Sequence, residues 1–241
     1  MKLNQDTKNP TDMPKLQSPF ERQEINGEYI CIPKIEKGYE WVFSGQSIAI
    51  EKLDGSNISI IVENNQVTAI YNRKNRIDIW KKGNKRFTEG VLEAIDTEYI
   101  NLAKMKDGQY FGELIGPQVN ANPYQLKRHL WIPLSILVER CRFKFWDEFV
   151  KELEDLDDSQ VYEKVSNVFK GLWSLYKRKT GLKGDVNEST GFEGLAAEGI
   201  VFYRQDTKEM AKLRRDMFDW YKGRGHGRQK ANFQQTELRY R

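Results

Sequence analysis

The sequence predicts an α+β fold made mainly of antiparallel sheet, with helices packed against the sheet in a single domain. In the first third of the chain, short runs rich in β-branched residues alternate with turn residues, as is typical of strands and hairpins. Apolar residues then recur at helical spacing in two blocks, near 86–106 and 146–178. Strand-like runs return after each block, so we expect the helices to pack on a sheet built from the whole chain.

The first predicted elements are short. Residues 1–19 are polar and hold three prolines, so we expect an extended lead-in. Tyr29–Ile32 and Trp41–Phe43 are apolar pieces that Pro33 and Gly38 interrupt, and both predict strands or strand edges.

Three strands are expected next, around two turns. Ser47–Ile50 and Asn57–Val62 are apolar runs joined by a bend at Asp54-Gly55, a pair that favours a hairpin turn. A second hairpin is expected where Asn64–Gln66 separates Asn57–Val62 from Val67–Tyr71. The early sheet is therefore expected to be antiparallel.

Two helical regions and four further strands complete the predicted fold. The first helix is expected from Arg86 to Lys106, where an Asp-Gly pair ends it. Trp146–Arg178 predicts two amphipathic helices that part near Asp157, with Ser159 as a cap. Four glycines between 179 and 195 predict a loop. The strands are expected at Gln109–Ile115, Leu130–Val138, Gly199–Tyr203 and Met210–Leu213.

Length and composition indicate a folded protein. At 241 residues the chain fits one large domain or two small ones, and an aromatic content of 12% argues against disorder. The net charge of +4 is compatible with a polyanionic partner but does not indicate one. Cys31 and Cys141 lack the spacing of a zinc site, so we expect reduced thiols, and no apolar run reaches membrane-spanning length. We therefore expect a cytoplasmic protein that does not enter a membrane.

The last twenty positions carry a basic tail. Residues 222–241 hold six lysines and arginines against one acid, Glu237. Such a tail is either a solvated segment or a contact for a phosphate backbone, and the sequence favours neither.

Five clusters carry residues suited to chemistry. They are Lys52–Gly55, Tyr71–Arg76, Phe111–Pro117, Glu198–Tyr203 and Lys212–Asp216. Lys52 is expected at the end of a rigid strand, and a lysine becomes a nucleophile when its neutral form is favoured by burial or by neighbouring cations. Taken singly, Lys52 is more simply a solvated strand end, and Glu113 and Glu198 are ordinary exposed acids.

Taken together, the five clusters resemble the covalent nucleotidyltransferase superfamily, which holds polynucleotide ligases and mRNA capping enzymes. Identity, order and approximate spacing all match from about Ile48 to Asp216, and the chain is most similar to the ATP-dependent RNA ligases. The resemblance implies an ATP-grasp-like nucleotidyltransferase domain of the ligase type. It also implies ATP and Mg²⁺ or Mn²⁺ as cofactors, and RNA with 5′-phosphate and 3′-hydroxyl ends as the partner.

The resemblance implies catalytic roles for three residues. Lys52 matches the lysine that attacks the α-phosphorus of ATP and becomes lysyl-AMP, and Lys212 matches a lysine that contacts the α-phosphate. Asp54 matches an aspartate needed for end joining, and Gly55 completes the turn that places the lysine. Arg214 stands where the family usually has lysine, which keeps the positive charge but adds a planar fork. Such cations neutralise the charge that spreads during phosphoryl transfer.

The remaining cofactor contacts are implied in the same way. Arg73 matches an arginine near the ribose and the 5′-phosphate end, and Glu113 matches a glutamate that accepts from ribose hydroxyls. Glu198 matches the carboxylate that holds the divalent metal, directly or through water. Trp131 is the expected aromatic that stacks on adenine. Glu51 either sets the local electrostatic field or reads the adenine amino group.

The resulting hypothesis is an ATP-dependent RNA ligase that acts in RNA repair. Residues 1–221 are expected to form the adenylyltransferase domain, with a helical insertion at about 146–178, and 222–241 the tail. Only 25 residues follow Asp216, so no OB-fold domain is expected. The alternatives are a DNA nick-sealing ligase, a GTP-dependent capping-type nucleotidyltransferase, and a catalytically silent RNA-binding module of the same fold. A protein partner is compatible with the sequence but not indicated by it.

Overall fold

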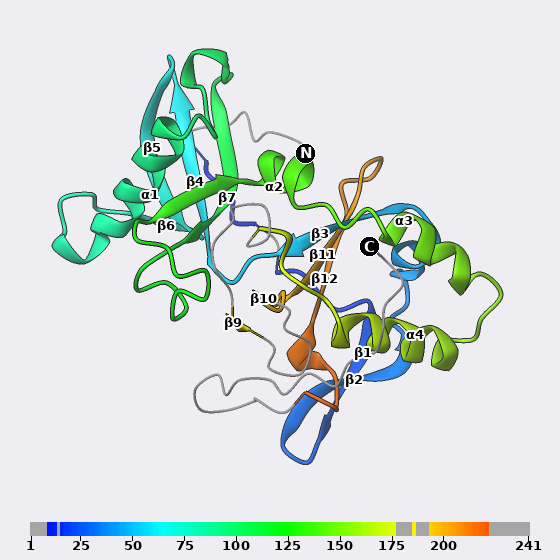
Figure 1. Ribbon diagram of the computed structural model, residues 1–241. Helices are drawn as coiled ribbons and strands as arrows, with labels where there is room; N and C mark the ends of the chain where they lie inside the picture. Colours follow the sequence, from blue (N-terminus) through cyan, green and yellow to red (C-terminus); the bar gives the residue numbers. More distant parts are fainter. Residues whose placement is uncertain (1–8, 14, 177–184, 187–192, 222–241) are drawn as a thin grey trace. The chain divides into compact units, whose positions relative to one another are not determined.

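The computed structural model describes residues 9–13, 15–176, 185–186 and 193–221. They form two compact units (Figure 1). Unit 1 comprises Met1–Lys15 and Leu53–Arg140, and unit 2 comprises Leu16–Lys52 and Cys141–Arg241. Both units combine antiparallel strands with a few helices, which confirms the predicted α+β class.

Unit 1 contains a five-stranded antiparallel sheet in the order β6-β5-β4-β7-β8. Its strands are β4 (Ser56–Glu63), β5 (Gln66–Asn72), β6 (Asn75–Arg76), β7 (Gly108–Ile115) and β8 (Leu130–Pro133). Its helices are α1 (Lys85–Asp96) and α2 (Leu134–Arg140), with 3₁₀ turns η2 (Lys82–Asn84) and η3 (Leu102–Lys104).

Helix α1 packs on one face of this sheet. Gly90 lies so close to β7 and β8 that a Cβ atom there would meet Leu114 Cδ1 at 2.3 Å and the Trp131 backbone nitrogen at 3.3 Å. Ile58, Ile60 and Leu114 are fully buried on this face. Because successive strand residues point to opposite faces, the neighbouring positions on β4 and β7 are presented on the other face.

Unit 2 contains a three-stranded antiparallel sheet in the order β12-β11-β3. The strands are β3 (Ser47–Lys52), β11 (Gly199–Arg204) and β12 (Met210–Arg214). Two further strand pairs are β1 (Phe20–Ile25) with β2 (Glu28–Ile35), and β9 (Asp185–Val186) with β10 (Glu193–Gly194). The helices are α3 (Trp146–Phe149) and α4 (Asp158–Lys170), with 3₁₀ turns η1 (Glu40–Val42), η4 (Val150–Leu153) and η5 (Arg215–Met217).

The core of unit 2 is aromatic. The ring centroids of Trp146 and Phe202 lie 4.9 Å apart, and those of Phe169 and Phe218 lie 5.2 Å apart. The Trp146 indole nitrogen donates to Ser47 Oγ at 3.0 Å, so the one polar atom of the ring is satisfied inside the core. One face of the three-stranded sheet joins this core, and the other face carries Lys52, Lys212 and Arg214 beside buried apolar residues such as Ile50.

Several predicted elements are confirmed. The hairpin of β4 and β5 turns at Asn64 and Asn65, whose φ values of 51° and 61° are the left-handed values that asparagine tolerates well. The predicted strands at Ser47–Ile50, Gln109–Ile115 and the final β11–β12 pair also form.

Two predictions about the early chain are wrong. Trp41–Phe43 was expected to be a strand or a strand edge, but Trp41 and Val42 lie in η1 with their side chains buried in the unit 2 core. The bend at Asp54-Gly55 is not a hairpin turn, because β3 pairs with β11 whereas β4 pairs with β5 and β7. The apolar runs on either side of the bend therefore belong to different sheets.

Two predicted elements end earlier than expected. The helix expected to reach Lys106 ends at Asp96, and Glu98 follows with the left-handed φ of 58°. The strand expected from Leu130 to Val138 ends at Pro133, after which α2 begins. A proline cannot donate to the sheet ladder but is well tolerated at the start of a helix, which accounts for the switch.

The helical block of unit 2 also differs from the prediction. It consists of α3, η4 and α4, and α4 ends at Lys170 rather than continuing toward Arg178. Asp157, not Ser159, caps α4: its side chain accepts from the backbone of Gln160 at 2.8 Å, and the Gln160 side chain accepts from the Asp157 backbone in return. Within the segment expected to be a loop, β9 and β10 form two-residue strands, while 179–184, 187–192 and the tail 222–241 lie outside the described residues.

Candidate active site

Three basic side chains project from one face of the unit 2 sheet. Lys52 pairs with Gly199, and Gly199 pairs with Arg214 across the next strand. Directly paired residues share a face, so Lys52 and Arg214 lie on the same face with a residue that has no side chain between them. Lys212 pairs with Val201, two positions along β11, and therefore belongs to the same face.

Glu198 joins this group from the start of β11. Its Oε2 lies 2.7 Å from Lys52 Nζ, and its Oε1 lies 3.7 Å from an Arg214 guanidinium nitrogen. Arg214 also contacts Asp216 at 3.0 Å. The side chains of Lys52 and Glu198 are each 21% exposed, so solvent screens this pair only partly. The structure thus brings Lys52, Glu198 and Arg214 together, and Lys212 lies on the same face of the sheet.

Gly199 makes this arrangement possible. A Cβ atom at this position would lie 2.1 Å from the Leu213 carbonyl oxygen and 2.8 Å from Arg214 Cα. Any larger residue would therefore push β12 away from β11 and separate Arg214 from Glu198. Gly199 is not among the site residues predicted from the sequence, although a glycine inside a strand is a signal of close backbone approach.

Backbone hydrogen bonds hold the end of β12, which carries Lys212 and Arg214. The Arg215 backbone nitrogen donates to the Glu198 carbonyl at 3.0 Å, and the Lys212 backbone nitrogen donates to the Gln17 carbonyl at 2.8 Å. Arg215 itself is buried, and burial lowers the pKa of its guanidinium to about 10. Its side chain donates to the Lys170 carbonyl and lies over the Trp220 ring, so it helps to fix the end of β12.

Glu51 lies on the opposite face of β3 from Lys52. Only 1% of its surface is exposed, its carboxylate accepts from the Ser174 hydroxyl, and it accepts from the Tyr176 backbone nitrogen at 2.8 Å. The Glu51 backbone nitrogen donates to Cys141. Glu51 therefore ties the 174–176 segment to the end of β3, and this long-range pairing had no signal in the sequence.

In unit 1, the Asp54-Gly55 bend lies against β7. A Cβ atom on Gly55 would meet the Leu114 carbonyl oxygen at 2.5 Å and Glu113 Cγ at 2.7 Å, so only glycine fits beside Glu113. The Asp54 backbone nitrogen donates to the Tyr124 hydroxyl at 2.9 Å, and the Gly55 carbonyl accepts from Asn120 at 2.7 Å. Asp54, Gly55 and Glu113 are thus brought together within unit 1.

Trp131 is placed on the other face of the unit 1 sheet from Glu113. Glu113 pairs with Ile132, whereas Trp131 pairs with Leu114, under helix α1. Trp131 is fully buried, and its indole nitrogen donates to the Ile58 carbonyl at 3.2 Å. The ring has no exposed face in this structure, so the stacking role stays a prediction that no contact here supports.

Arg73 lies at the turn between β5 and β6, with its side chain 59% exposed and 3.7 Å from Asp12. The segment around Asp12 runs along the sheet face that carries Glu113. Thr11 and Gln109 exchange two hydrogen bonds of 2.8 and 2.9 Å, and Asn57 donates to the Met13 sulfur at 3.1 Å. These contacts attach residues 11–13 to unit 1.

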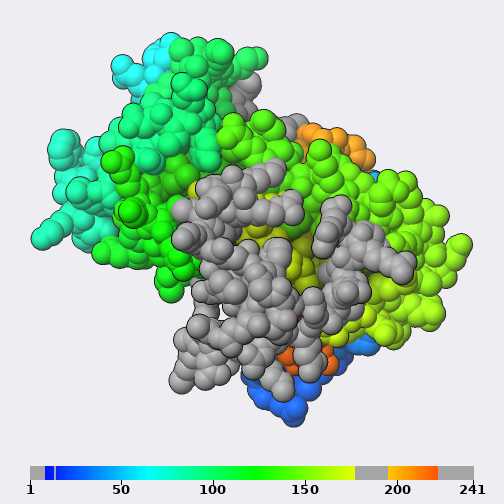
Figure 2. Space-filling view, viewed as in Figure 1, coloured from blue at the N-terminus to red at the C-terminus, as the bar shows by residue number. Residues whose placement is uncertain are grey.

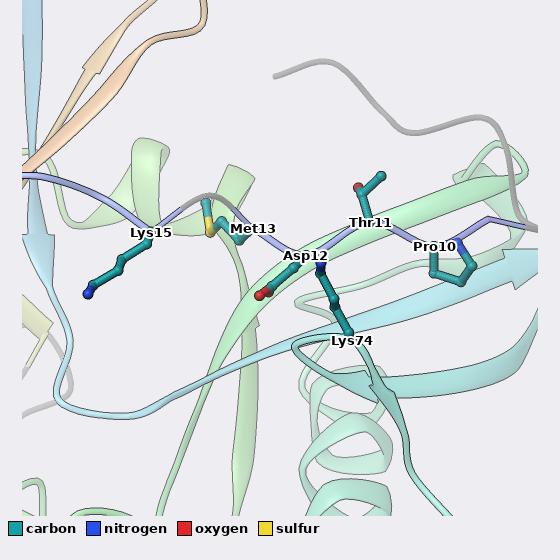
Figure 3. Close-up of a pocket in the computed structure, with 6 residues that line it drawn as sticks. All are labelled: Pro10, Thr11, Asp12, Met13, Lys15 and Lys74. Atoms are coloured by element: carbon teal, nitrogen blue, oxygen red, sulfur yellow. The ribbon is translucent and has the colours of Figure 1, made fainter.

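A hollow of about 580 Å³ opens beside this segment (Figure 3). It is lined by Pro10, Thr11, Asp12, Met13, Lys15 and Lys74. In Figure 3 the Lys74 side chain extends toward the segment that carries Asp12. The hollow is therefore lined by acidic and basic side chains together with Pro10 and Met13, and no motif of the sequence predicted that residues 10–13 lie there.

The described residues contain no group of three or more histidine, cysteine, aspartate or glutamate side chains arranged to hold a metal ion. The donor set suits a hard cation that shares its coordination with phosphate, because Mg²⁺ keeps several waters and needs only one or two carboxylates. Glu198, between Lys52 and Arg214, fits that requirement. No helix in the described part of the chain has the length and apolarity to cross a membrane.

Solved structures similar to this chain are RNA ligases of Naegleria gruberi. A variant with AMP and Mn is 14% identical and has a TM-score of 0.43, with 85% of this chain and 57% of that chain covered. A variant with ATP and Mn is 13% identical, with a TM-score of 0.44 and coverage of 85% and 58%. The same ligase with PPi is 13% identical, with a TM-score of 0.43 and coverage of 89% and 60%.

The chain spans 57% to 60% of the length of these solved chains. No curated protein matches it significantly. The family model described as RNA ligase matches residues 45–220, which is more than half of the chain and includes all five sequence clusters. The chain therefore belongs to the RNA ligase family of the covalent nucleotidyltransferase superfamily, as the sequence predicted.

Proposed function

We propose that this protein is an ATP-dependent RNA ligase that forms lysyl-AMP at Lys52. AMP then passes to a 5′-phosphate of RNA, and the activated end is joined to a 3′-hydroxyl with release of AMP. Membership of the RNA ligase family supports the reaction class. The observation that carries the assignment is the group of Lys52, Glu198, Lys212 and Arg214 on one sheet face of unit 2.

The ion pair of Lys52 explains how the nucleophile is held before reaction. Lys52 Nζ lies 2.7 Å from a carboxylate oxygen of Glu198, so the side chain is held at the end of β3. A divalent cation bound at Glu198 would compete with Lys52 for this carboxylate. In the proposed reaction the Lys52 nitrogen gives up a proton to solvent and bonds to the α-phosphorus of ATP, and the bond from that phosphorus to pyrophosphate breaks.

The neighbouring cations stabilise the transition state in this proposal. Negative charge spreads over the phosphate oxygens in the transition state, and fixed positive groups stabilise it most where water is partly excluded. Lys212 and Arg214 are the residues proposed to do so. Mg²⁺ or Mn²⁺ held at Glu198 would add positive charge to the same phosphates.

Asp54, Glu113 and Arg73 are proposed to have the roles that the resemblance implies. Glu113, beside the Asp54-Gly55 bend, would accept from the ribose hydroxyls, and Arg73 would contact the ribose and the 5′-phosphate end. Asp54 is the proposed end-joining residue, and the tight fit of Gly55 against Glu113 supports a fixed geometry for both. Glu51 is proposed to hold the backbone of β3 rather than to react.

The biological setting remains part of the proposal. RNA repair in the cytoplasm is consistent with Cys31 and Cys141, which are both free and buried thiols. The substrate is proposed to be RNA with a 5′-phosphate and a 3′-hydroxyl.

The test combines labelling with end joining. Purified protein and α-labelled ATP with Mg²⁺ should give a label that survives denaturation, and GTP should give none. Addition of RNA with a 5′-phosphate and a 3′-hydroxyl should then yield a joined product. Lys52→Ala should take up no label. Lys34→Ala is its matched control and should label normally, because Lys34 also extends from a strand and pairs with a carboxylate, Glu21.

Other outcomes would favour the alternatives. Labelling by GTP would indicate a capping-type nucleotidyltransferase, and joining of nicked DNA but not of RNA would indicate a DNA ligase. RNA binding without labelling by either nucleotide would indicate a silent RNA-binding module. Any of these three results would overturn the proposal.

A further inference from the structure

An exposed tryptophan stands on the loop that leads into α1. Trp80 is 90% exposed, while its neighbour Ile79 is 47% exposed. Tryptophan is usually well buried, yet Trp80 is the most exposed large hydrophobic side chain in the described part of the molecule. Figures 1 and 2 show the segment before α1 projecting outward, in teal at the left.

The loop that presents Trp80 is held by its own hydrogen bonds. The Trp80 backbone nitrogen donates to the Asp78 carboxylate at 3.0 Å, and the Asn84 side chain donates to the Asp78 carbonyl at 2.9 Å. The Asn84 backbone nitrogen donates to Lys81, and Ile77 donates to Ile70 on β5. The backbone at Trp80 is therefore fixed, and the exposure of the ring is built into the loop.

The surroundings of Trp80 are strongly basic. From Arg73 to Arg86 the chain carries seven lysines and arginines and one acid, Asp78. Arg73 pairs with Asp12 and Lys85 pairs with Glu89. The two residues that follow Trp80, Lys81 and Lys82, are exposed and form no ion pair with any described residue. A solvated ring is thus followed by positive charge that no described residue neutralises.

We propose that the Ile77–Asn84 loop binds single-stranded RNA, with one base stacked on Trp80 and the adjacent phosphates on Lys81 and Lys82. The inference rests on the proposed RNA ligase function and names where the substrate strand docks away from the reacting end. Proteins that bind single strands combine exposed aromatic rings with basic grooves. An isolated ring reaches only bases that are not stacked in a duplex, which favours a single strand.

Other partners fit these observations less well. A protein partner would need a contiguous apolar surface, whereas in this loop Trp80 has one exposed large apolar neighbour, Ile79, and is followed by two lysines. A lipid surface would accept a tryptophan with lysines, but RNA follows from the family of the chain. Anionic vesicles are therefore used as a competing ligand in the test.

The experiment measures binding of a 5′-phosphorylated single-stranded oligoribonucleotide to the full chain by fluorescence anisotropy at several salt concentrations. Trp80→Ala should weaken binding about tenfold, and Trp80→Phe should restore most of the affinity, because base stacking needs an aromatic face. Lys81→Gln with Lys82→Gln should lower the slope of log affinity against log salt by about 1.4, since each single-strand phosphate contact contributes roughly 0.7.

Two controls test whether the changes in RNA binding are specific to Trp80, Lys81 and Lys82 or follow from the loss of any exposed apolar side chain or any two lysines. Leu92→Ala removes another large apolar side chain of unit 1, which is 63% exposed on α1, and should leave RNA affinity unchanged. Lys151→Gln with Lys164→Gln removes two lysines that already pair with Glu148 and Glu152, and should leave the salt slope unchanged. Thermal unfolding of each variant verifies that the fold is intact.

The failure of this inference is distinguishable from failure of the proposed function. Labelling by ATP needs no RNA, so Trp80→Ala should label at the rate of the unmodified protein. Unchanged RNA affinity in Trp80→Ala overturns the docking site even if labelling and joining succeed. Binding of Trp80 to anionic vesicles but not to RNA overturns it as well. Absence of labelling in the unmodified protein, with Trp80-dependent RNA binding intact, would contradict the ligase proposal alone.

Discussion

Lys52 Nζ lies 2.7 Å from Glu198 Oε2, and the same carboxylate faces Arg214 at 3.7 Å through its other oxygen. One acid therefore holds two cations that stand on either side of Gly199. The relationship links the proposed nucleophile to the proposed metal ligand, because whatever draws Glu198 away also releases Lys52 from this ion pair.

Glu198→Gln tests whether labelling needs the charge of Glu198, which pairs with Lys52 and is proposed to hold the metal, or only its size. The amide keeps the size of the side chain but removes the charge, so we expect labelling by ATP to fall about 100-fold or more, as it does when charge stabilisation is removed from a phosphate site. The measurement is the initial labelling rate over a range of Mg²⁺ concentrations. Glu21→Gln, which removes the partner of Lys34, should label normally. Normal labelling by Glu198→Gln would contradict the role given to Glu198.

Gly199→Ala should damage both stability and activity. The new methyl group would lie 2.1 Å from the Leu213 carbonyl oxygen, so β12 must move, and overpacking of this kind costs about 1–3 kcal/mol in the free energy of unfolding. Urea unfolding measures the loss in the free energy of unfolding. A lower rate of ATP labelling is the expected consequence of displacing Arg214. Gly83→Ala is the control, because a methyl group there meets no atom within 4 Å. Equal stability of the two variants would show that the strands are not closely held.

Cys31 should be unreactive in the folded protein. Burial raises the pKa of its thiol to about 11, against an ordinary value of 9.0. The folded state thus favours the neutral thiol, so this contribution to stability is present below pH 9 and is lost as the pH rises toward 11. Alkylation by iodoacetamide at pH 8, followed in Cys141→Ala, should occur only after unfolding. Rapid alkylation of the native protein would contradict the burial of Cys31.

The Glu89 carboxylate should make stability depend on acid pH. Hydrogen bonds from Lys85 and His129 lower the pKa of Glu89 from its ordinary value of 4.5. Because the pKa is lowered in the folded state, the stabilisation is fully present above the ordinary pKa of 4.5. It is lost as the pH falls through the folded-state pKa. Glu89→Gln should therefore flatten the decline of unfolding free energy in acid, measured by urea unfolding from pH 7 to pH 3. An identical decline in both proteins would rule out this contribution.

The grouping of Lys52, Glu198, Lys212 and Arg214 could be proposed from the sequence because the order of the clusters resembles that of the nucleotidyltransferases. Alternation along β12 then puts Lys212 and Arg214 on one face without further information. The same rule explains why Trp131 could not be placed. A shift of one residue between β7 and β8 moves it from the face of Glu113 to the face of α1, and only the register decides.

Contacts between distant parts of the chain were beyond the sequence patterns. Nothing local indicates that Glu51 meets Ser174 and Tyr176, or that Asp12 reaches Arg73. The helix that ends at Asp96 was expected to continue because apolar spacing persists beyond it, whereas the left-handed Glu98 and the contacts of the following residues end it. Periodicity predicts element type well, but packing fixes boundaries and partners.

The most direct test of the central claim is to locate the adenylyl group on the protein. The chain is incubated with ATP and Mg²⁺, digested with a protease that does not cleave at lysine, and the modified peptide is sequenced by mass spectrometry. The account predicts AMP bonded to the side chain of Lys52, with no modified peptide in Lys52→Ala. An adduct on another residue, or an undiminished adduct in Lys52→Ala, would contradict the assignment of Lys52 as the nucleophile.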